Sequence, residues 1–263
     1  MQLLLYLNKS LRKSKKMFKF KDDKKIEMMT IAGKKLAIIK KKLKNFSQVG
    51  IKFEQIEKMT FDLILASKGR PNFALVPGYR WATCINKNQG LCHGIPQNNV
   101  IEDGDLITID LGMIFGGYNV DSSMSFIVGL ATDEKKLFLQ AGYQAFSKVL
   151  KKATIGNSIY DLSSAMEKYL TKKGYQMVYQ LTGHSIGKKL HEAPFIPCFA
   201  NIEDKKYKLY DGQTLAIEVM YTQGNAELRL AKDGWTYETK DGALSCLVEE
   251  TILITNNSPI ILT

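Results

Sequence analysis

Two aspartates, Asp110 and Asp121, lie on either side of a predicted β-hairpin turn. The segments 106–115 and 118–128 are strand-like, and the Gly-Gly pair between them is a strong signal for a two-residue turn. In that register the two aspartates are diagonal neighbours on one face of the sheet, about 7–8 Å apart at Cα. Two carboxylates so placed repel each other unless a cation lies between them. The pair alone leaves two interpretations open: a cation site, or two ordinary aspartates on a solvated sheet face, which is the commoner case.

The chain contains only three histidines, and two of them lie close together. His184 and His191 are seven residues apart in the glycine-flanked segment TGHSIGKKLHE, and His93 lies in CHGIP. A single histidine more often serves structure than binds a ligand. The clustering of two of them therefore favours a functional site.

Two glutamates interrupt apolar strand-like segments. Glu218 lies in LAIEVM and Glu249 in LVEETI. A carboxylate is costly to bury unless it is paired or bound to a metal. One such glutamate is compatible with a solvated face, but two of them together with the aspartate hairpin indicate four carboxylates that converge on cations.

Rigid elements must hold these groups, and hydrophobic periodicity predicts where the elements lie. Apolar residues recur at helical spacing near the N-terminus, and Thr132 or Asp133 and then Ser158 are suitable N-cap residues for later helices. The predicted helices cover 26–43, 53–68, 132–152 and 158–174, with a loop at 69–81. The predicted strands outside the hairpin cover 82–86, 175–182, 213–221 and 246–254. Because helices and strands are mixed without a regular βαβ repeat, the pattern favours an α+β fold.

Length and composition predict a globular protein rather than a secreted or membrane-spanning one. The chain has 263 residues, of which 45% are hydrophobic, enough for a substantial core. The apolar run at 3–7 is too short for a signal peptide, and no stretch approaches the length needed to cross a bilayer. The four cysteines form no CxxC pair, which favours free thiols in a reducing compartment. These features predict a cytoplasmic protein that does not enter a membrane.

The net charge of +11 is concentrated at the N-terminus. Residues 1–45 contain 15 Lys or Arg against 3 acidic residues, so the rest of the chain is nearly neutral. Residues 1–20 show little periodicity and are predicted to be a flexible basic extension. A solvated lysine-rich face is the favoured interpretation of the charge, and a contact with ribosomal RNA is the alternative.

Taken together, the motifs resemble those of the type I methionine aminopeptidases. CHGIP, ID followed eleven residues later by DSS, TGHSIG, LHE, LAIE and VEETI occur in that family's order and at closely matching spacing. The resemblance covers about residues 21–263 and implies one catalytic domain with the pita-bread fold. In that fold a curved antiparallel sheet with covering helices surrounds a dinuclear metal site.

The resemblance also implies the metal ligands. Two divalent ions would be held by Asp110, Asp121, His184, Glu218 and Glu249. Asp121 and Glu249 match the bridging positions, and Asp110 matches the chelating ligand of one ion. His184 and Glu218 complete the site of the other ion. Four carboxylates and one imidazole suit Mn, Fe(II), Co or Zn, so the metal is not specified.

Further residues match positions that contact the substrate. His93 and His191 match histidines that hydrogen-bond the substrate without binding metal, and Glu218 is assigned to proton transfer beside its metal. The implied substrate pocket is completed by Tyr79, Cys84 and Trp235.

The implied activity is removal of the initiator methionine from nascent chains whose second residue is small, by a monomeric enzyme. One alternative is an Xaa-Pro aminopeptidase, which shares the fold and ligands but usually has a large N-terminal domain and further histidines. A second alternative is a non-catalytic pita-bread binding protein, which typically loses ligands.

Four positions depart from the family pattern without removing a ligand. They are Ser185 for a glycine, Leu190 for an aromatic residue, Val219 for a proline and Glu250 for a histidine. Side chains alternate across a strand, so Glu250 is predicted to point away from the metals if Glu249 points toward them. Residues 1–16 lie outside the resemblance, and Met17 stands where many relatives begin. We expect residues 1–16 to be dispensable for catalysis.

Overall fold

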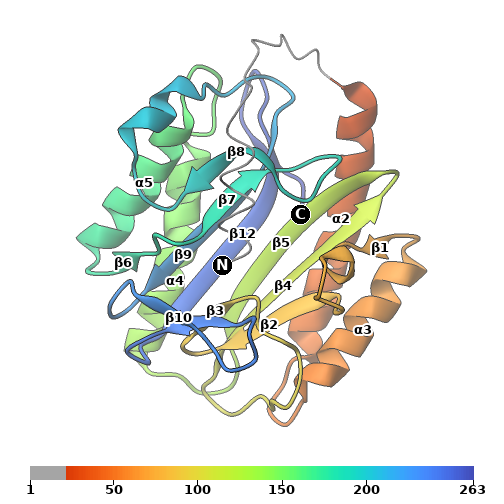
Figure 1. Cartoon of the computed structure of the whole chain (residues 1–263), viewed down its shortest axis with the longest axis vertical. Helices are drawn as coiled ribbons and strands as arrows, with labels where there is room; N and C mark the ends of the chain where they lie inside the picture. Colours follow the sequence, from red (N-terminus) through yellow and green to blue (C-terminus); the bar gives the residue numbers. More distant parts are fainter. Residues whose placement is uncertain (1–21) are drawn as a thin grey trace.

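The computed structural model describes residues 22–263. The predicted flexible extension at 1–20 lies outside these residues. Figure 1 shows a broad, strongly twisted sheet with helices packed behind it. No helix among residues 22–263 is long and apolar enough to cross a membrane.

The main sheet has ten strands, and all its pairings are antiparallel. Its central order is β1-β4-β5-β12-β9-β7-β8, with β2 on β4, β6 on β9 and β13 on β12. These strands are β1 (Arg70–Pro71), β2 (Thr83–Lys87), β4 (Leu106–Phe115), β5 (Tyr118–Ile127), β6 (Gln176–Met177), β7 (Thr182–Ser185), β8 (Glu192–Pro197), β9 (Thr214–Thr222), β12 (Ser245–Leu253) and β13 (Ile260–Ile261). A second sheet of three strands consists of β3 (Gly90–Cys92), β10 (Leu228–Leu230) and β11 (Tyr237–Thr239).

Four α-helices in the described chain cover one face of the main sheet. They are α2 (Asp23–Phe46), α3 (Phe53–Ala66), α4 (Asp133–Leu150) and α5 (Ile159–Lys172), with short 3-10 helices at Phe73–Leu75 and Ile202–Lys206. In Figure 1, α2 and α3 lie behind one half of the sheet and α4 and α5 lie behind the other half. Two buried apolar clusters follow this division, one between α2, α3 and β4–β5 and one between α4, α5 and β9–β12.

The helix starts follow from local capping chemistry. The side chains of Asp22 and Thr132 accept hydrogen bonds from the N–H groups of Lys25 (3.0 Å) and Lys135 (3.2 Å). Ser158 begins α5 in a reciprocal capping box with Asp161. The prediction of a cap at Thr132 or Asp133 and at Ser158 is confirmed, whereas the first helix begins before the predicted residue 26.

The hairpin has the predicted register. Phe115 pairs with Tyr118 and Gly112 pairs with Asp121. Gly116 and Gly117 have φ values of 58° and 84°, which is why the two-residue turn favours glycine at both positions.

One predicted strand is largely wrong. The segment 175–182 forms only the two-residue strand β6, and the chain then runs irregularly to β7. Tyr179, in this irregular stretch, contacts Phe199 with tilted rings whose centroids lie 4.9 Å apart. The short strands β1, β3, β7, β10, β11 and β13 were not predicted, because segments this short carry little periodicity. The six-residue strand β8 was not predicted either.

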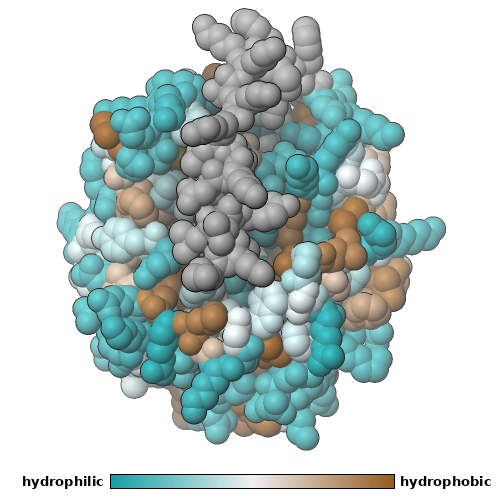
Figure 2. Space-filling model, viewed as in Figure 1, coloured by the Kyte–Doolittle hydropathy of each residue, from teal (hydrophilic) through white to brown (hydrophobic). Residues whose placement is uncertain are grey.

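The viewed surface is mostly hydrophilic outside the grey residues. Figure 2 shows hydrophobic residues there in small groups among hydrophilic ones.

Candidate metal centre and substrate pocket

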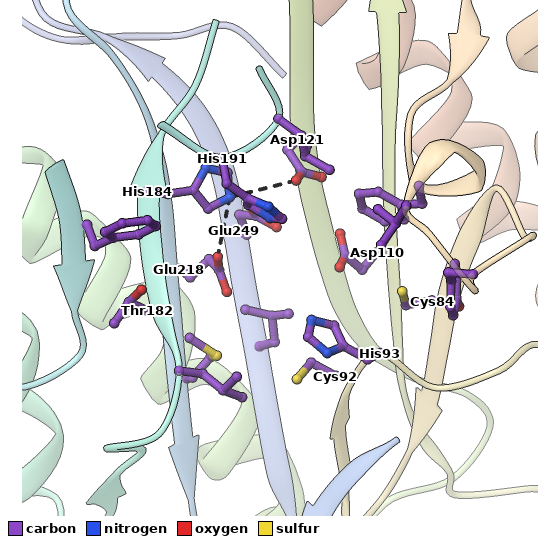
Figure 3. Close-up of a pocket in the computed structure, with 18 of the residues that line it drawn as sticks. Cys84, Cys92, His93, Asp110, Asp121, Thr182, His184, His191, Glu218 and Glu249 are labelled. Atoms are coloured by element: carbon purple, nitrogen blue, oxygen red, sulfur yellow. Dashed lines mark ion pairs between the residues drawn. The ribbon is translucent and has the colours of Figure 1, made fainter. Parts of the chain in front are cut away.

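The five predicted ligands come from five different strands and meet on the sheet face opposite the helices. Figure 3 shows them around one cavity, with Asp110 on β4, Asp121 on β5, His184 on β7, Glu218 on β9 and Glu249 on β12. Strand register explains the convergence. Ser123 pairs with both Asp110 and Glu249, and Glu249 pairs in turn with Glu218. These residues form one row across the sheet, and side chains in such a row share a face.

The closest group consists of Asp121, His184 and Glu249, whose candidate ligand atoms all lie within 4.8 Å of one another. The Nε2 atom of His184 lies 3.9 Å from Oδ2 of Asp121 and 3.7 Å from Oε1 of Glu218. Its Nδ1 atom lies 3.1 Å from the carbonyl oxygen of Ser185, so Nδ1–H is the donor. This bond leaves the Nε2 lone pair directed at the carboxylates, as a metal-binding imidazole requires.

The carboxyl groups have strongly raised pKa values. Burial raises the pKa of Asp110, Glu218 and Glu249 well above the ordinary range, and the neighbouring carboxylates raise it further. Burial also raises the pKa of Asp121, to about 7. Four carboxylates without a compensating positive charge are unfavourable in a buried site.

Unsatisfied oxygen atoms show that these residues fit a cation. Among residues 22–263, Oδ1 of Asp110, Oδ1 of Asp121 and Oε1 of Glu249 are buried and have no hydrogen-bond partner. Buried oxygens are normally paired. Hard oxygen donors together with one imidazole form a donor set for divalent metal ions. The residues therefore fit the group that the sequence predicts.

The other two histidines line the same cavity as uncharged rings. Burial and the nearby His191 lower the pKa of His93 to about 4, and burial lowers the pKa of His191. The ring of His191 lies 4.5 Å from that of His184, and the ring of His93 lies 5.7 Å from that of Tyr237. His93 also has a φ of 57°, an uncommon backbone conformation that turns CHGIP after β3. Neutral imidazoles are able to donate one hydrogen bond to a carbonyl group.

The cavity, about 680 Å³ in volume, has an apolar end beside the carboxylates. Phe73, Tyr79 and Cys84 form a small cluster there, completed by partly buried side chains that include Val76, Leu190 and Trp235. The rings of Tyr79 and Trp235 are 5.0 Å apart in an edge-to-face arrangement. The hydroxyl of Tyr79 is directed away to the carbonyl oxygen of Thr83 (2.7 Å), so its ring borders the pocket while its polar atom is bonded.

The structure places all the predicted site residues around this cavity and adds others. Phe73 and Val76 also line the cavity but were not predicted. The only sequence feature that could have indicated them is that they are apolar residues within the Gly- and Pro-containing segment 69–81. Burial raises the pKa of Cys84 and Cys92 well above the ordinary range, so both are protonated thiols at neutral pH in the metal-free protein.

Two of the departures lie away from the cavity. Glu250 points to the helix side of the sheet, where its Oε2 lies 2.6 Å from Nζ of Lys40. The prediction from strand alternation is therefore confirmed. Val219 is packed into the apolar cluster under α4 and α5. Ser185 Oγ donates to the carbonyl oxygen of Pro194 at 3.2 Å, and Leu190 lines the cavity itself.

An antiparallel pita-bread sheet with a buried carboxylate and histidine centre defines a metal-dependent peptidase. The chain belongs to metallopeptidase family M24, whose sequence profile matches residues 27–256. The predicted fold and the prediction of a metal-dependent aminopeptidase are confirmed, and the family and the buried cluster indicate divalent metal binding.

Two methionine aminopeptidases are similar to this chain along nearly their whole length. The chain is 32% identical to a methionine aminopeptidase of Clostridium perfringens, over 92% of this chain and 97% of that one. The crystal structure of methionine aminopeptidase from Thermotoga maritima matches with a TM-score of 0.90 at 30% identity, over 94% and 99% of the two chains. A prolidase from Pyrococcus furiosus matches with a TM-score of 0.75 at 22% identity and over 64% of its length, which shows a shared fold.

Proposed function

We propose that this protein is a methionine aminopeptidase that removes the N-terminal methionine from peptides and nascent chains whose second residue is small. The observation that carries the proposal is the apolar end of the cavity lying directly beside the buried carboxylates. Cys84 in that apolar end pairs across the sheet with Asp110. A methionine side chain in the apolar end would therefore place its free α-amine among the carboxylates.

We assign the ligand roles as the resemblance implies. Asp121 and Glu249 would hold both of two ions, Asp110 would complete the site of one ion, and His184 with Glu218 would complete the site of the other. When bound, divalent ions at such a site supply Lewis acidity and lower the pKa of a water molecule toward neutrality. The identity of the metal remains one of Mn, Fe(II), Co or Zn.

Side chains of the protein carry out the proton transfer, contact the scissile carbonyl group and bind the methionine side chain. Glu218 takes the proton of the attacking water on its carboxylate and delivers it to the leaving amine. His191 and His93, both neutral, donate hydrogen bonds to the scissile carbonyl group or the peptide. The rings of Tyr79 and Trp235 hold the flexible, unbranched thioether in the apolar end of the cavity.

The test joins a metal assay to peptide hydrolysis. The purified protein is loaded in turn with Mn, Fe(II), Co or Zn, and hydrolysis of Met-Ala, Met-Leu and Ala-Pro peptides is compared. We expect metal binding and fast release of methionine from the Met-Ala peptide only. Efficient cleavage of the Ala-Pro peptide would support the Xaa-Pro alternative, and metal binding without any hydrolysis would support a binding protein.

We further propose that residues 21–263 act as one catalytic domain in a cytoplasmic monomer. Residues 1–16 are expected to be dispensable for catalysis, and a salt-dependent contact with ribosomal RNA is the candidate role of the basic extension.

A further inference from the structure

The loop between β7 and β8 carries the histidine to which the proposed function assigns the carbonyl contact. Leu190 and His191 of this loop both line the cavity. Two bonds shape the loop locally: Gly187 N–H donates to the carbonyl oxygen of Lys189 (3.1 Å), and Lys189 N–H donates to Oε1 of Glu192 (2.9 Å). Both bonds stay within the loop and its immediate continuation, so neither fixes its distance from the metal ligands.

Asn119 links this loop to the strand that carries Asp121. Its side-chain Nδ2 donates to the carbonyl oxygens of Gly187 and Lys188, each at 3.1 Å. Its backbone N–H also donates to the carbonyl oxygen of Gly187, at 2.7 Å. One residue of β5 thus makes three hydrogen bonds to two consecutive loop residues.

The environment of Asn119 fixes the direction of its amide. The side chain is buried, and Nδ2 of Asn72 lies 3.4 Å from its Oδ1. The Asn119 oxygen therefore faces a donor and its NH₂ group faces the loop. Asn72 itself packs against Gly112, where a Cβ atom would lie 2.4 Å from Oδ1 of Asn72. Gly112 is the strand partner of Asp121. Asn119 and Asn72 are therefore packed beside the residue pair that includes the proposed ligand Asp121.

We propose that Asn119 is a positioning residue that sets the place of His191 relative to the metal ligands. Asn119 lies two residues before Asp121 on a rigid strand, and His191 lies three residues after the second carbonyl group that Asn119 holds. Loss of the Asn119 side chain removes two of the three bonds and leaves the backbone bond to Gly187 in place. Because catalytic geometry tolerates little displacement, the resulting shift of the loop lowers turnover without removing a ligand. This inference rests on the proposed function, since His191 matters only if a peptide bond is cleaved there.

The test compares Asn119→Leu in the full-length parent and in a His191→Ala background. Leucine keeps the approximate shape of asparagine but donates no hydrogen bond. We expect Asn119→Leu to keep the parental metal content and to lower kcat on a Met-Ala peptide by at least about 10-fold. In the His191→Ala background the same change should lower kcat by less than about 2-fold, because no histidine is left to misplace.

Asn157→Leu is the matched control. The side-chain amide of Asn157 also donates to a loop carbonyl oxygen, that of Lys152 at 2.9 Å, and neither residue lines the cavity. This control variant should leave kcat unchanged. Asn119→Ala repeats the comparison in case leucine prevents folding.

Three results would overturn the inference: unchanged kcat in a folded Asn119 variant, an equal loss in both backgrounds, or loss of metal. Failure of both Asn119 variants to fold would overturn it too, by showing a general structural role. A parent protein that binds metal but does not cleave the peptide would instead refute the proposed function.

Discussion

Nζ of Lys40 lies 2.6 Å from Oε2 of Glu250, on the face of the sheet opposite the metal site. Lys40 is a buried residue of α2, and its ammonium group also lies 2.6 Å from Oγ of Ser122. Ser122 and Glu250 directly follow Asp121 and Glu249, the two proposed bridging ligands. The pair therefore joins α2 to the backs of the two ligand strands. It also supplies a positive partner for a carboxylate at a position where a histidine is usual in the family.

We predict that Lys40→Met destabilises the protein by up to about 3 kcal/mol, because it leaves the half-buried Glu250 carboxylate without its cationic partner. The double variant Lys40→Met/Glu250→Gln should recover much of that loss, since the unpaired charge is gone. Urea unfolding of the metal-loaded proteins measures both. Equal stability of the parent and Lys40→Met would show that the pair contributes nothing.

Asp121→Asn should abolish turnover and sharply reduce the metal content. Asp121 belongs to the tightest group of candidate ligand atoms, and its proposed bridging role means that its loss weakens both ion sites. Metal content after gel filtration and hydrolysis of a Met-Ala peptide measure the two effects. Normal activity of this variant at a matched metal concentration would refute the two-metal assignment.

His191→Ala should keep its metal and lose about 10²–10³-fold in kcat, the usual effect of removing one donor to a developing oxyanion. His191 lies next to His184 in the cavity but outside the group whose ligand atoms converge. If this variant loses metal in parallel with activity, His191 is a ligand and our assignment is wrong.

The metal-free protein should become less stable as the pH rises from about 6.5 to 8. Burial raises the pKa of Asp121 to about 7 and that of Asp110, Glu218 and Glu249 well above the ordinary range. The folded state then holds protons that the unfolded chain has released, so the free energy of unfolding falls with rising pH. The buried histidines have lowered pKa values and act in the opposite sense, but only below their unfolded pKa of about 6.5.

Bound metal should remove this trend, because it replaces the protons as the counter-charge. The measurement is Tm against pH with chelator and with metal. A Tm of the metal-free protein that rises from pH 6.5 to 8 would show that the carboxylates are not clustered as described.

Deletion of residues 2–16 should leave kcat/KM on a short Met-Ala peptide unchanged, because every proposed ligand lies beyond residue 109. Co-sedimentation with ribosomes at low salt should be measured on the same protein. Loss of co-sedimentation alone would support the ribosomal RNA contact, whereas a large loss of peptide activity in folded, metal-loaded protein would show that the segment belongs to the active structure.

The sequence by itself determined the parts of the site that depend on local geometry. The Gly116-Gly117 turn sets the register that puts Asp110 and Asp121 on one face, and strand alternation sends Glu249 and Glu250 to opposite faces. The resemblance added the ligand set, because the order and spacing of six short motifs are far more specific than any one of them.

Only the tertiary structure decided what depends on contacts between distant segments. The partner of Glu250 is Lys40, 210 residues away, and no periodicity predicts which lysine of a basic helix is buried. The side chain of Asn119 donates to the carbonyl oxygen of Gly187, which is 68 residues away in the chain. A bond to a backbone carbonyl group has no signature in the sequence. Phe73 and Val76 line the pocket from the connection between β1 and β2, which includes the 3-10 helix at Phe73–Leu75. The path of such connections follows tertiary packing rather than a residue pattern.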